Sequence, residues 1–413
     1  MNKQFKNQSL YKPELMAPAG DWTMLNAAIN AGADAVYFGL DKLNMRAKAA
    51  NFTIEELPEI ISLCKKKSVK TYLTLNTIVF EEELNDLDEI IIAAKKNQVD
   101  RIICSDLAVA DICSRHNFPF CISTQSSISN SLAADIYKKL GAVRIVLARE
   151  CSLKEIKRIR TKTDLEIEAF VHGAMCIAVS GRCFMSHHLF GKSANRGECI
   201  QPCRREYEVY DAAIKKSMIV GEDYIMSPKD LCTIEFIDKL IEAGINSFKI
   251  EGRKRSPEYV ATTVSVYRNA IDDYFNGSLN DEKKKNYLGK LETVFNRGFS
   301  SGFYFGIPSS EEYADIYGSK AATRKVYTGR VINYYKKNKV VYISIESGAV
   351  YTGDDILIIG PTTGVVEVKP DIILNEDKNV SSASKGERVT FPCSVLVRPH
   401  DNVYVVRQAT DED

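Results

Sequence analysis

The sequence has no long hydrophobic run and almost no net charge. None of its 413 residues belongs to a run near the ~20 apolar residues that span a bilayer, so no membrane association is expected. The first residues, MNKQFKNQSLYKPELM, contain no apolar stretch of the signal-peptide type, and we expect a cytoplasmic protein. The net charge of +1 excludes an overall basic field, although local basic clusters remain at Arg204-Arg205 and at 253–255.

Several catalytic motifs are missing as well. No G-x-G-x-x-G follows the first expected strand, which weakens a dinucleotide-binding fold. No G-x-S-x-G lies in the context of a Ser-His-Asp triad, and no H-E-x-x-H is present. A protease would therefore need another nucleophile. Cys176 with His172 is one candidate pair, although their spacing across a strand end does not ensure contact.

Cysteine is plentiful by contrast, with eleven in the chain. Those in apolar surroundings, expected to be small core residues, are Cys64, Cys104, Cys113, Cys121 and Cys151. A compact C-x6-C-x15-C-x3-C array is formed by Cys176, Cys183, Cys199 and Cys203. In a reducing compartment such thiolates are ligands or catalysts more often than disulfides. They could hold structural zinc or an iron–sulfur cluster. Only the second pair has the short spacing of zinc hairpins, which weakens zinc somewhat, but the spacing alone leaves both interpretations open.

Short β-rich runs alternate with amphipathic helical runs over the first two thirds of the chain. The expected strands span residues 14–19, 35–39, 71–76, 101–105, 120–124, 144–148, 165–171 and 247–251. Expected helices include 54–67, 82–96, 129–140 and 153–161, and glycines 32, 141 and 244 are expected to end helices in the left-handed conformation. This order predicts an α/β fold, a (β/α)8 TIM-type barrel, with an open doubly wound sheet as the alternative.

The expected domain limits follow from two breaks in this pattern. After the seventh strand, an insertion at about 174–230 carries the cysteine array. From about residue 326 the sequence pattern changes to short β-rich runs separated by turn residues, which predicts a small all-β barrel. We therefore expect a catalytic barrel at 1–297, a connector at 298–325 and a small β-barrel domain at 326–413.

Polar residues at strand ends are expected to converge on the mouth of the barrel, because side chains alternate across a strand. Glu168 and His172 share one face of the seventh strand, and Lys249, Glu251 and Arg253 share one face of the eighth. The residues predicted to be catalytic are His172, Glu168, Lys249 and Glu251, and those predicted to bind substrate are Arg46, Asn76, Gln125, Arg149 and Arg253. Burying so many polar groups without a purpose would be costly.

From Glu168 the chain reads EAFVHGAMCIAVSGRCFMS, which resembles the signature E-x-F-x-x-G-[SA]-x-C-x4-G-x-C-x-x-S of the peptidase U32 family. The segments ELMAPAGDWTMLNAAINAGADAVYFGL, SANRGECIQPCRREY, MSPKDL and FKIEGRKRSPEYV are also similar to that family. The resemblance spans roughly residues 14 to 275, and the terminal all-β part is similar to the small barrel of many members.

The resemblance implies a 4Fe–4S cluster on Cys176, Cys183, Cys199 and Cys203. Cys232 in SPKDLC is a departure and could replace Cys203. Members of this length resemble prephenate-dependent tRNA hydroxylases, which implies 5-hydroxylation of the wobble uridine. The alternatives are a peptidase or collagenase, a 23S rRNA hydroxylase, and a non-catalytic RNA-binding scaffold with structural zinc.

The expected partners follow from this interpretation. They are tRNA and a small dicarboxylate, prephenate, for which Arg149 and Arg253 are the preferred cations. A homologous protein partner is left open. The tRNA phosphates are expected to meet the basic clusters at 204–205 and 253–255, with Lys336, Lys337 and Lys339 of the all-β part holding the rest of the molecule.

Overall fold

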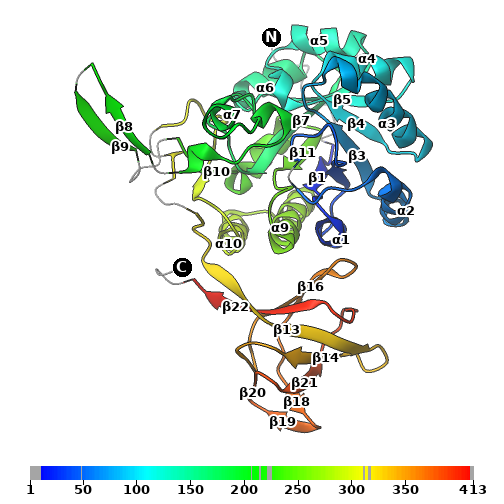
Figure 1. The fold of residues 1–413 in the computed structure, drawn as a ribbon, viewed down its shortest axis with the longest axis vertical. Helices are drawn as coiled ribbons and strands as arrows, with labels where there is room; N and C mark the ends of the chain where they lie inside the picture. Colours follow the sequence, from blue (N-terminus) through cyan, green and yellow to red (C-terminus); the bar gives the residue numbers. More distant parts are fainter. Residues whose placement is uncertain are drawn as a thin grey trace.

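The computed structural model describes residues 11–47, 49–205, 207–213, 215–220, 226–309, 312–314 and 318–409 (Figure 1). Parallel strands follow one another around a barrel, which closes because β11 pairs with both β1 and β7. The barrel strands are β1 (Glu14–Pro18), β2 (Ala35–Phe38), β3 (Lys70–Leu75), β4 (Arg101–Cys104), β5 (Phe120–Ile122), β6 (Ala142–Val146), β7 (Glu166–Gly173) and β11 (Ser247–Ile250). The predicted (β/α)8 barrel is confirmed, and the open sheet is excluded.

Helices cover the outside of the barrel. They are α1 (Trp22–Asn30), α2 (Leu57–Lys66), α3 (Leu84–Lys96), α4 (Leu107–Arg115), α5 (Ser131–Lys139), α6 (Leu153–Arg160), α8 (Ile237–Glu242), α9 (Pro257–Phe275) and α10 (Asp281–Glu292). Asp21 caps α1 by accepting a hydrogen bond from the backbone N–H of Met24 at 2.8 Å. As expected, Gly32, Gly141 and Gly244 lie just after α1, α5 and α8 with positive φ, a conformation that favours glycine.

The insertion between β7 and β11 contains short elements. They are α7 (Met185–Phe190), the single turns Ala194–Arg196 and Pro202–Arg204, the hairpin β8 (Tyr207–Asp211) and β9 (Lys216–Val220), and β10 (Asp230–Cys232). β7 runs on beyond the barrel and pairs antiparallel with β10, which in turn pairs with β12 (Phe299–Ser300). The predicted connector at 298–325 therefore includes a strand of the barrel sheet.

The C-terminal part is an antiparallel sheet with its own apolar core. Its strands are β13 (Thr323–Tyr335), β14 (Val340–Ile345), β16 (Ile356–Gly360), β17 (Gly364–Val368), β18 (Ile373–Asn375), β19 (Lys378–Val380), β21 (Arg388–Pro392) and β22 (Asn402–Gln408), and β15 (Ala349–Tyr351) pairs separately with β20 (Ser382–Ser384). Figure 1 shows it beneath α1, α9 and α10.

The two parts are in direct contact. Asn26 and Asn30 of α1 donate hydrogen bonds to the carbonyls of Pro361 and Thr363 at 2.8 and 3.2 Å. The start of β17 comes so close to α1 that a Cβ on Gly364 would lie 2.8 Å from the backbone nitrogen of Ala27. Within the described residues, no helix is long and apolar enough to cross a bilayer.

Candidate functional site

A cavity lies between the carboxyl ends of the barrel strands and the cysteine-bearing insertion. It brings together most of the predicted site residues: Arg46, Asn76, Gln125, Arg149, Lys249, Glu251, Arg253 and the four array cysteines all line it. These side chains come from the ends of five barrel strands and from the insertion. This end of a (β/α)8 barrel is where catalytic sites lie.

The four array cysteines share this cavity although they span 28 positions of sequence. Cys176 follows β7 and is exposed, whereas Cys183, Cys199 and Cys203 are partly buried. The backbone N–H groups of Met185 and Gln201 donate to the sulfurs of Cys183 and Cys199, both at 3.4 Å. Hydrogen bonds of this kind tune iron–sulfur clusters.

The spacing of these thiols bears on which metal centre they suit. Around a single zinc ion, a Zn–S bond of about 2.3 Å places tetrahedral sulfurs about 3.8 Å apart. Within the described residues, no three side chains of the His, Cys, Asp or Glu type form a group close enough to hold one metal ion. Four cysteine thiols around one cavity are the donor set that an iron–sulfur cluster uses, so the residue types present fit such a group.

The strand-end side of the cavity is rich in arginine. Arg46 donates to Glu251 at 2.8 Å. Burial would raise the pKa of Glu251, but Arg46, Arg149 and Arg253 lower it to about 2. Burial also lowers the pKa of Arg253 to about 10. Among the described lining residues, six are Lys or Arg and one, Glu251, carries a carboxylate. The lining is therefore mainly cationic and suited to anions.

Arg149 is the cation best prepared for a ligand. Its guanidinium lies 4.2 Å from the ring centre of Phe170, and its Nη1 donates to the carbonyl of Ala174 at 2.8 Å. Its Nε–H is buried and has no hydrogen-bond partner among the described residues. In contrast, Nη1 of Arg253 donates to Asn44 at 3.2 Å and to Thr74 at 3.0 Å.

Asn76 and Gln125 form a polar pair on the same wall. The Asn76 amide donates to Oε1 of Gln125 at 2.9 Å, and the Gln125 amide donates back to the carbonyl of Asn76 at 2.9 Å. Ser123 donates to the same Gln125 oxygen at 2.9 Å. These reciprocal bonds fix the orientation of both amides at the cavity.

Glu168 does not lie at the mouth, contrary to the expectation from strand alternation. It points into the barrel but sits deeper, where Arg144, Ser247 and Lys249 bind its carboxylate at 2.9, 3.0 and 2.9 Å. Burial raises the pKa of Glu168, yet Lys249 and Arg144 lower it overall. Lys249 therefore joins this deeper network to the cavity.

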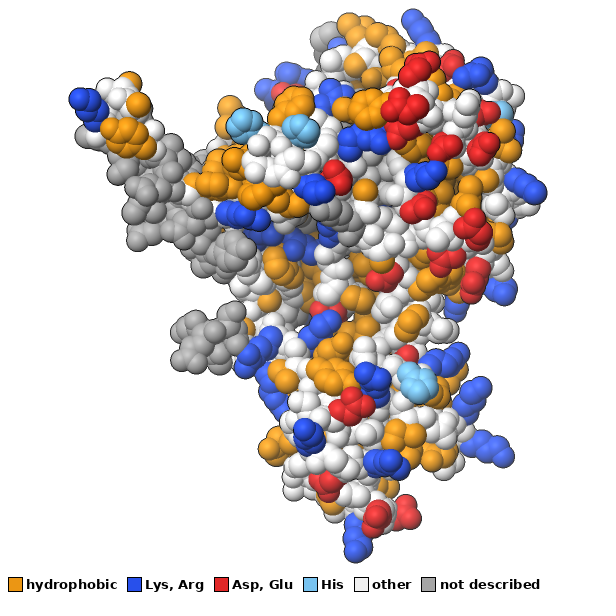
Figure 2. Space-filling model, viewed as in Figure 1, with side chains coloured by type: hydrophobic (Ala, Val, Ile, Leu, Met, Phe, Trp, Pro, Cys, Tyr) orange, Lys and Arg blue, Asp and Glu red, His pale blue; other side chains and the backbone are white. Residues whose placement is uncertain are grey.

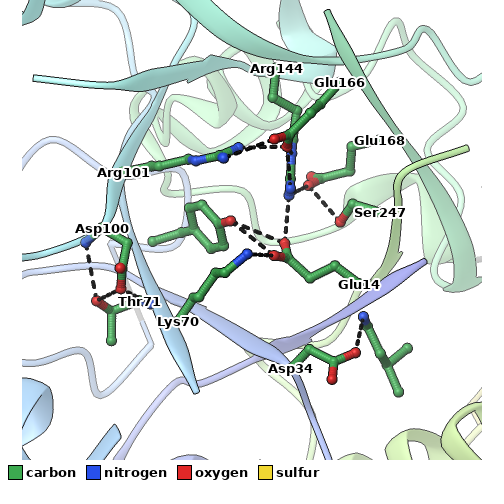
Figure 3. A network of polar contacts seen from close by, with 12 residues as sticks. Glu14, Asp34, Lys70, Thr71, Asp100, Arg101, Arg144, Glu166, Glu168 and Ser247 are labelled. Atoms are coloured by element: carbon green, nitrogen blue, oxygen red, sulfur yellow. Dashed lines mark hydrogen bonds and ion pairs between the residues drawn. The ribbon is translucent and has the colours of Figure 1, made fainter. Parts of the chain in front are cut away.

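The deeper network closes the opposite end of the barrel (Figure 3). Arg144 binds Glu14 at 2.7 Å and Glu166 at 2.7 Å in addition to Glu168. Arg101 reaches the same Glu166 carboxylate at 2.6 and 2.9 Å. We call the set Glu14, Arg101, Arg144, Glu166 and Glu168 the barrel floor.

The prediction that His172 faces the mouth is wrong, because β7 contains a bulge. Lys249 pairs with Phe170, but Ile250 pairs with His172, so Val171 is an extra residue. The extra residue reverses the alternation and turns His172 toward α9. There its ring lies among Tyr259, Tyr267 and Phe299, and burial lowers its pKa to about 3.

The two basic clusters are also less exposed than expected. Arg204 is buried and donates to Ser227 at 2.7 Å and to the carbonyl of Pro228 at 2.6 Å. Arg253 is buried at the cavity, and Arg255 lies 3.7 Å from the ring centre of Phe295. Of the two clusters, Arg205 and Lys254 are exposed.

Cys232 lies apart from the array. It is buried in β10, does not line the cavity, and accepts from the hydroxyl of Tyr267 at 3.9 Å. Burial raises its pKa to about 12. Nothing in this arrangement brings Cys232 to the position of Cys203. The predicted core cysteines, Cys64, Cys104, Cys113, Cys121 and Cys151, are all buried as well.

Comparison with known proteins agrees with the signature around these cysteines. The model of peptidase family U32 matches residues 20–314. The chain belongs to peptidase family U32. It is 43% identical over 403 residues to a protein of Porphyromonas gingivalis named "Collagenase", covering 95% of this chain and 97% of that one.

Other relatives carry names from RNA modification. The chain is 40% identical over 381 residues to "tRNA hydroxylation protein P1" of Bacillus subtilis, covering 91% of this chain and 90% of that one. It is 32% identical over 359 residues to "23S rRNA 5-hydroxycytidine C2501 synthase" of Escherichia coli, covering 81% of this chain and 54% of that protein.

Two U32 signature positions have a clear structural reason in this member. Phe170 lines the cavity as the surface on which Arg149 rests. Gly173 has a φ of 106°, and a Cβ there would lie 2.6 Å from the carbonyl oxygen of Glu251. Sequence reasoning missed other lining residues, including Tyr37, whose hydroxyl donates to the carbonyl of Ile250 at 2.9 Å. Tyr37 is two positions after Ala35 in β2, so alternation alone could have placed it inside the barrel.

Proposed function

We propose that this U32 member is an iron–sulfur RNA hydroxylase that adds the 5-hydroxyl of the wobble uridine in tRNA, with prephenate as co-substrate. The observation that carries the proposal is the shared cavity, where four cysteines face an excess of arginines. Relatives named as tRNA and rRNA hydroxylation proteins support RNA as the substrate class.

The cysteines Cys176, Cys183, Cys199 and Cys203 would hold a 4Fe–4S cluster. When bound, such a cluster supplies redox or Lewis-acid chemistry beside the substrate. The residues of the chain do the rest of the positioning. The fixed amide pair Asn76–Gln125 offers hydrogen bonds along one wall. Glu251, ionised and held by Arg46, is the nearest candidate for accepting a hydrogen bond or a proton in the cavity.

A dicarboxylate such as prephenate would meet Arg149 first. Its buried Nε–H lacks a partner among the described residues, and a carboxylate would satisfy that donor. Nη1 of Arg253 is already directed to Asn44 and Thr74, so Arg253 offers fewer free donors than its full guanidinium carries. Lys249, held at the cavity by Glu168, adds a third cation.

A peptidase is the second candidate, because of the relative named "Collagenase". None of the described histidines lines the cavity with the thiols, so the pair Cys176–His172 has no geometric support. The segment GFSSG at 298–302 matches G-x-S-x-G by its letters. Its central Ser300 lies in β12 and accepts a hydrogen bond from the N–H of Gly302, and no strand-to-helix turn surrounds it.

The metal centre can be tested separately from the reaction. Protein purified without oxygen should contain about four irons per chain. Cys203→Ser should lose iron, whereas Cys232→Ala, the matched control, should keep it because Cys232 lies outside the cavity. Stoichiometric zinc without iron would contradict the cluster and favour a scaffold.

The reaction is tested by nucleoside mass spectrometry of tRNA and rRNA from a deletion strain. We expect loss of 5-hydroxyuridine derivatives from tRNA, restored by the wild-type gene and not by Cys203→Ser. Loss of a hydroxylated base from rRNA alone would redirect the proposal to ribosomal RNA. Unchanged nucleosides together with metal-free proteolysis would support the peptidase instead.

A further inference from the structure

Hydrophobic side chains are unusually exposed around the opening of the cysteine cavity. Phe184, next to Cys183, is 76% exposed, and Phe190 at the end of α7 is 41% exposed. Ile177, Val179 and Leu189 are exposed beside them. We call these five residues together with Arg205 the aromatic rim. Figure 2 shows hydrophobic side chains gathered over the α7 region. Apolar surface of this kind marks a binding face.

The charge around the rim points to a polyanion. The segment 176–205 contains Arg182, Lys192, Arg196, Arg204 and Arg205 but one acidic residue, Glu198, whereas the whole chain balances 55 basic against 54 acidic residues. Arg182, Lys192 and Arg205 are exposed. A neutral protein that binds nucleic acid must do so through a local patch such as this one.

The geometry of Arg205 adds a planar contact surface. Its guanidinium lies 4.6 Å from the ring centre of Phe190, so cation and ring are paired at the edge of the rim. Exposed aromatic rings beside cations are the usual surface on which unpaired bases stack. Because Phe184 directly follows a cavity cysteine, a base that stacks on it would lie at the entrance to the cavity.

We propose that the aromatic rim is a stacking surface for unpaired bases of an RNA loop, with Phe184 beside the base that enters the cavity. The proposal rests on the proposed RNA substrate and adds how the loop is held. It predicts recognition of a single-stranded loop, since paired bases do not offer their faces.

The test uses full-length, iron-loaded protein and a short unmodified RNA hairpin with a fluorescent adenine analogue in its loop. Phe184→Ala should weaken hairpin binding about 5- to 150-fold, the range expected for losing one base stack, and should remove the quenching caused by stacking. Phe184→Leu should weaken it similarly, because leucine keeps an apolar side chain but no ring. Leu132→Ala is the control, since Leu132 on α5 is 75% exposed and does not line the cavity.

The iron content of each variant is measured to check the neighbouring cysteine. If Phe184→Ala loses iron, Phe190→Ala tests the same surface from the outer end of α7. Wild-type binding and quenching by Phe184→Leu and Phe190→Ala would overturn the proposal. So would a rim that mediates association between protein chains, seen as sedimentation that changes in these variants while hairpin binding does not.

Failure of this inference is distinguishable from failure of the proposed reaction. Binding and quenching are measured without prephenate or turnover. Rim-dependent hairpin binding by a protein that hydroxylates nothing would leave the stacking surface standing. Normal hydroxylation and normal hairpin affinity in the rim variants would remove the stacking surface alone.

Discussion

At the barrel floor Arg144 contacts the carboxylates of Glu14, Glu166 and Glu168, whereas at the mouth the Nε–H of Arg149 has no partner among the described residues. Both guanidiniums lie inside one barrel, and both are largely removed from water. The difference is that the floor surrounds Arg144 with three carboxylates, while at the mouth Arg46, Arg149 and Arg253 share the carboxylate of Glu251. Unmatched buried charge is costly, so it indicates a ligand that completes the site.

The largest effect should come from breaking the floor. Arg144 is 2% exposed, and Arg144→Ala would remove the cation that Glu14, Glu166 and Glu168 share, leaving each carboxylate with one other cation. Removing one partner of a buried ion pair costs about 3–5 kcal/mol of unfolding free energy. The fluorescence of Trp22, the single tryptophan, reports unfolding of the barrel in urea.

Arg101→Ala is the matched control for that variant. Arg101 binds the same Glu166, but both side chains are partly exposed, so water can replace the lost contact. We expect a clearly smaller loss. If Arg144→Ala were as stable as wild type, the ion pairs of the barrel floor would not contribute to the free energy of unfolding.

At the mouth, Arg149→Ala should affect function rather than stability. Hydrogen bonds between charged groups contribute about 1.5–3 kcal/mol, which corresponds to about 10- to 150-fold in affinity. We therefore expect the KM for prephenate to rise by that factor, with unchanged iron content and an unchanged urea midpoint. RNA hydroxylation at wild-type rates under limiting prephenate would remove Arg149 from the carboxylate site.

His172 should make the fold sensitive to mild acid. Its folded pKa is about 3, below the usual 6.5, because of burial and then Arg255. Between these two pKa values, His172 is protonated in the unfolded chain but remains neutral in the folded chain. The stability is complete above pH 6.5 and falls by about 1.4 kcal/mol per pH unit as the pH drops below it.

The window between about pH 6.5 and 5 isolates this histidine, because Glu166 and Glu251, with pKa values of about 2, lose their contribution only below their unfolded pKa near 4.5. Urea titrations across that window should give a flatter pH dependence for His172→Gln than for wild type. His116→Gln, which removes a partly exposed histidine on α4's end, is the control. Identical slopes for all three proteins would contradict a neutral buried His172.

The barrel and most of the mouth could be predicted because they depend on local signals. Polar strand ends placed Arg149 and Glu251 at the mouth, and the insertion after the seventh strand placed the four array cysteines there as well. His172 could not be placed, because the bulge at Val171 arises from pairing with β11 and leaves no mark in the sequence letters. The position of Glu168 below the mouth could not be predicted either, because it depends on a contact with Arg144 of another strand.

The smallest effect is expected far from the mouth, at exposed lysines that could contact tRNA phosphates. Lys336, Lys337 and Lys339 are exposed at the β13–β14 turn, well away from α7 in Figure 1. Deleting the C-terminal sheet would strip contacts from α1, so substitution is the cleaner test. Changing all three to Glu should weaken tRNA binding modestly. In a plot of log affinity against log salt concentration, the slope should become shallower by roughly two to three units.

The control for the turn is a pair of exposed lysines elsewhere in the same sheet region, Lys378 and Lys385, and the change in salt slope is compared per substituted lysine. Their replacement by Glu changes the domain charge without touching the turn, and should leave the salt slope nearer to wild type. If both sets reduce it equally, the turn acts only through general charge. If neither does, tRNA is held at the barrel mouth and the aromatic rim, and the three lysines of the turn lie on a solvated loop.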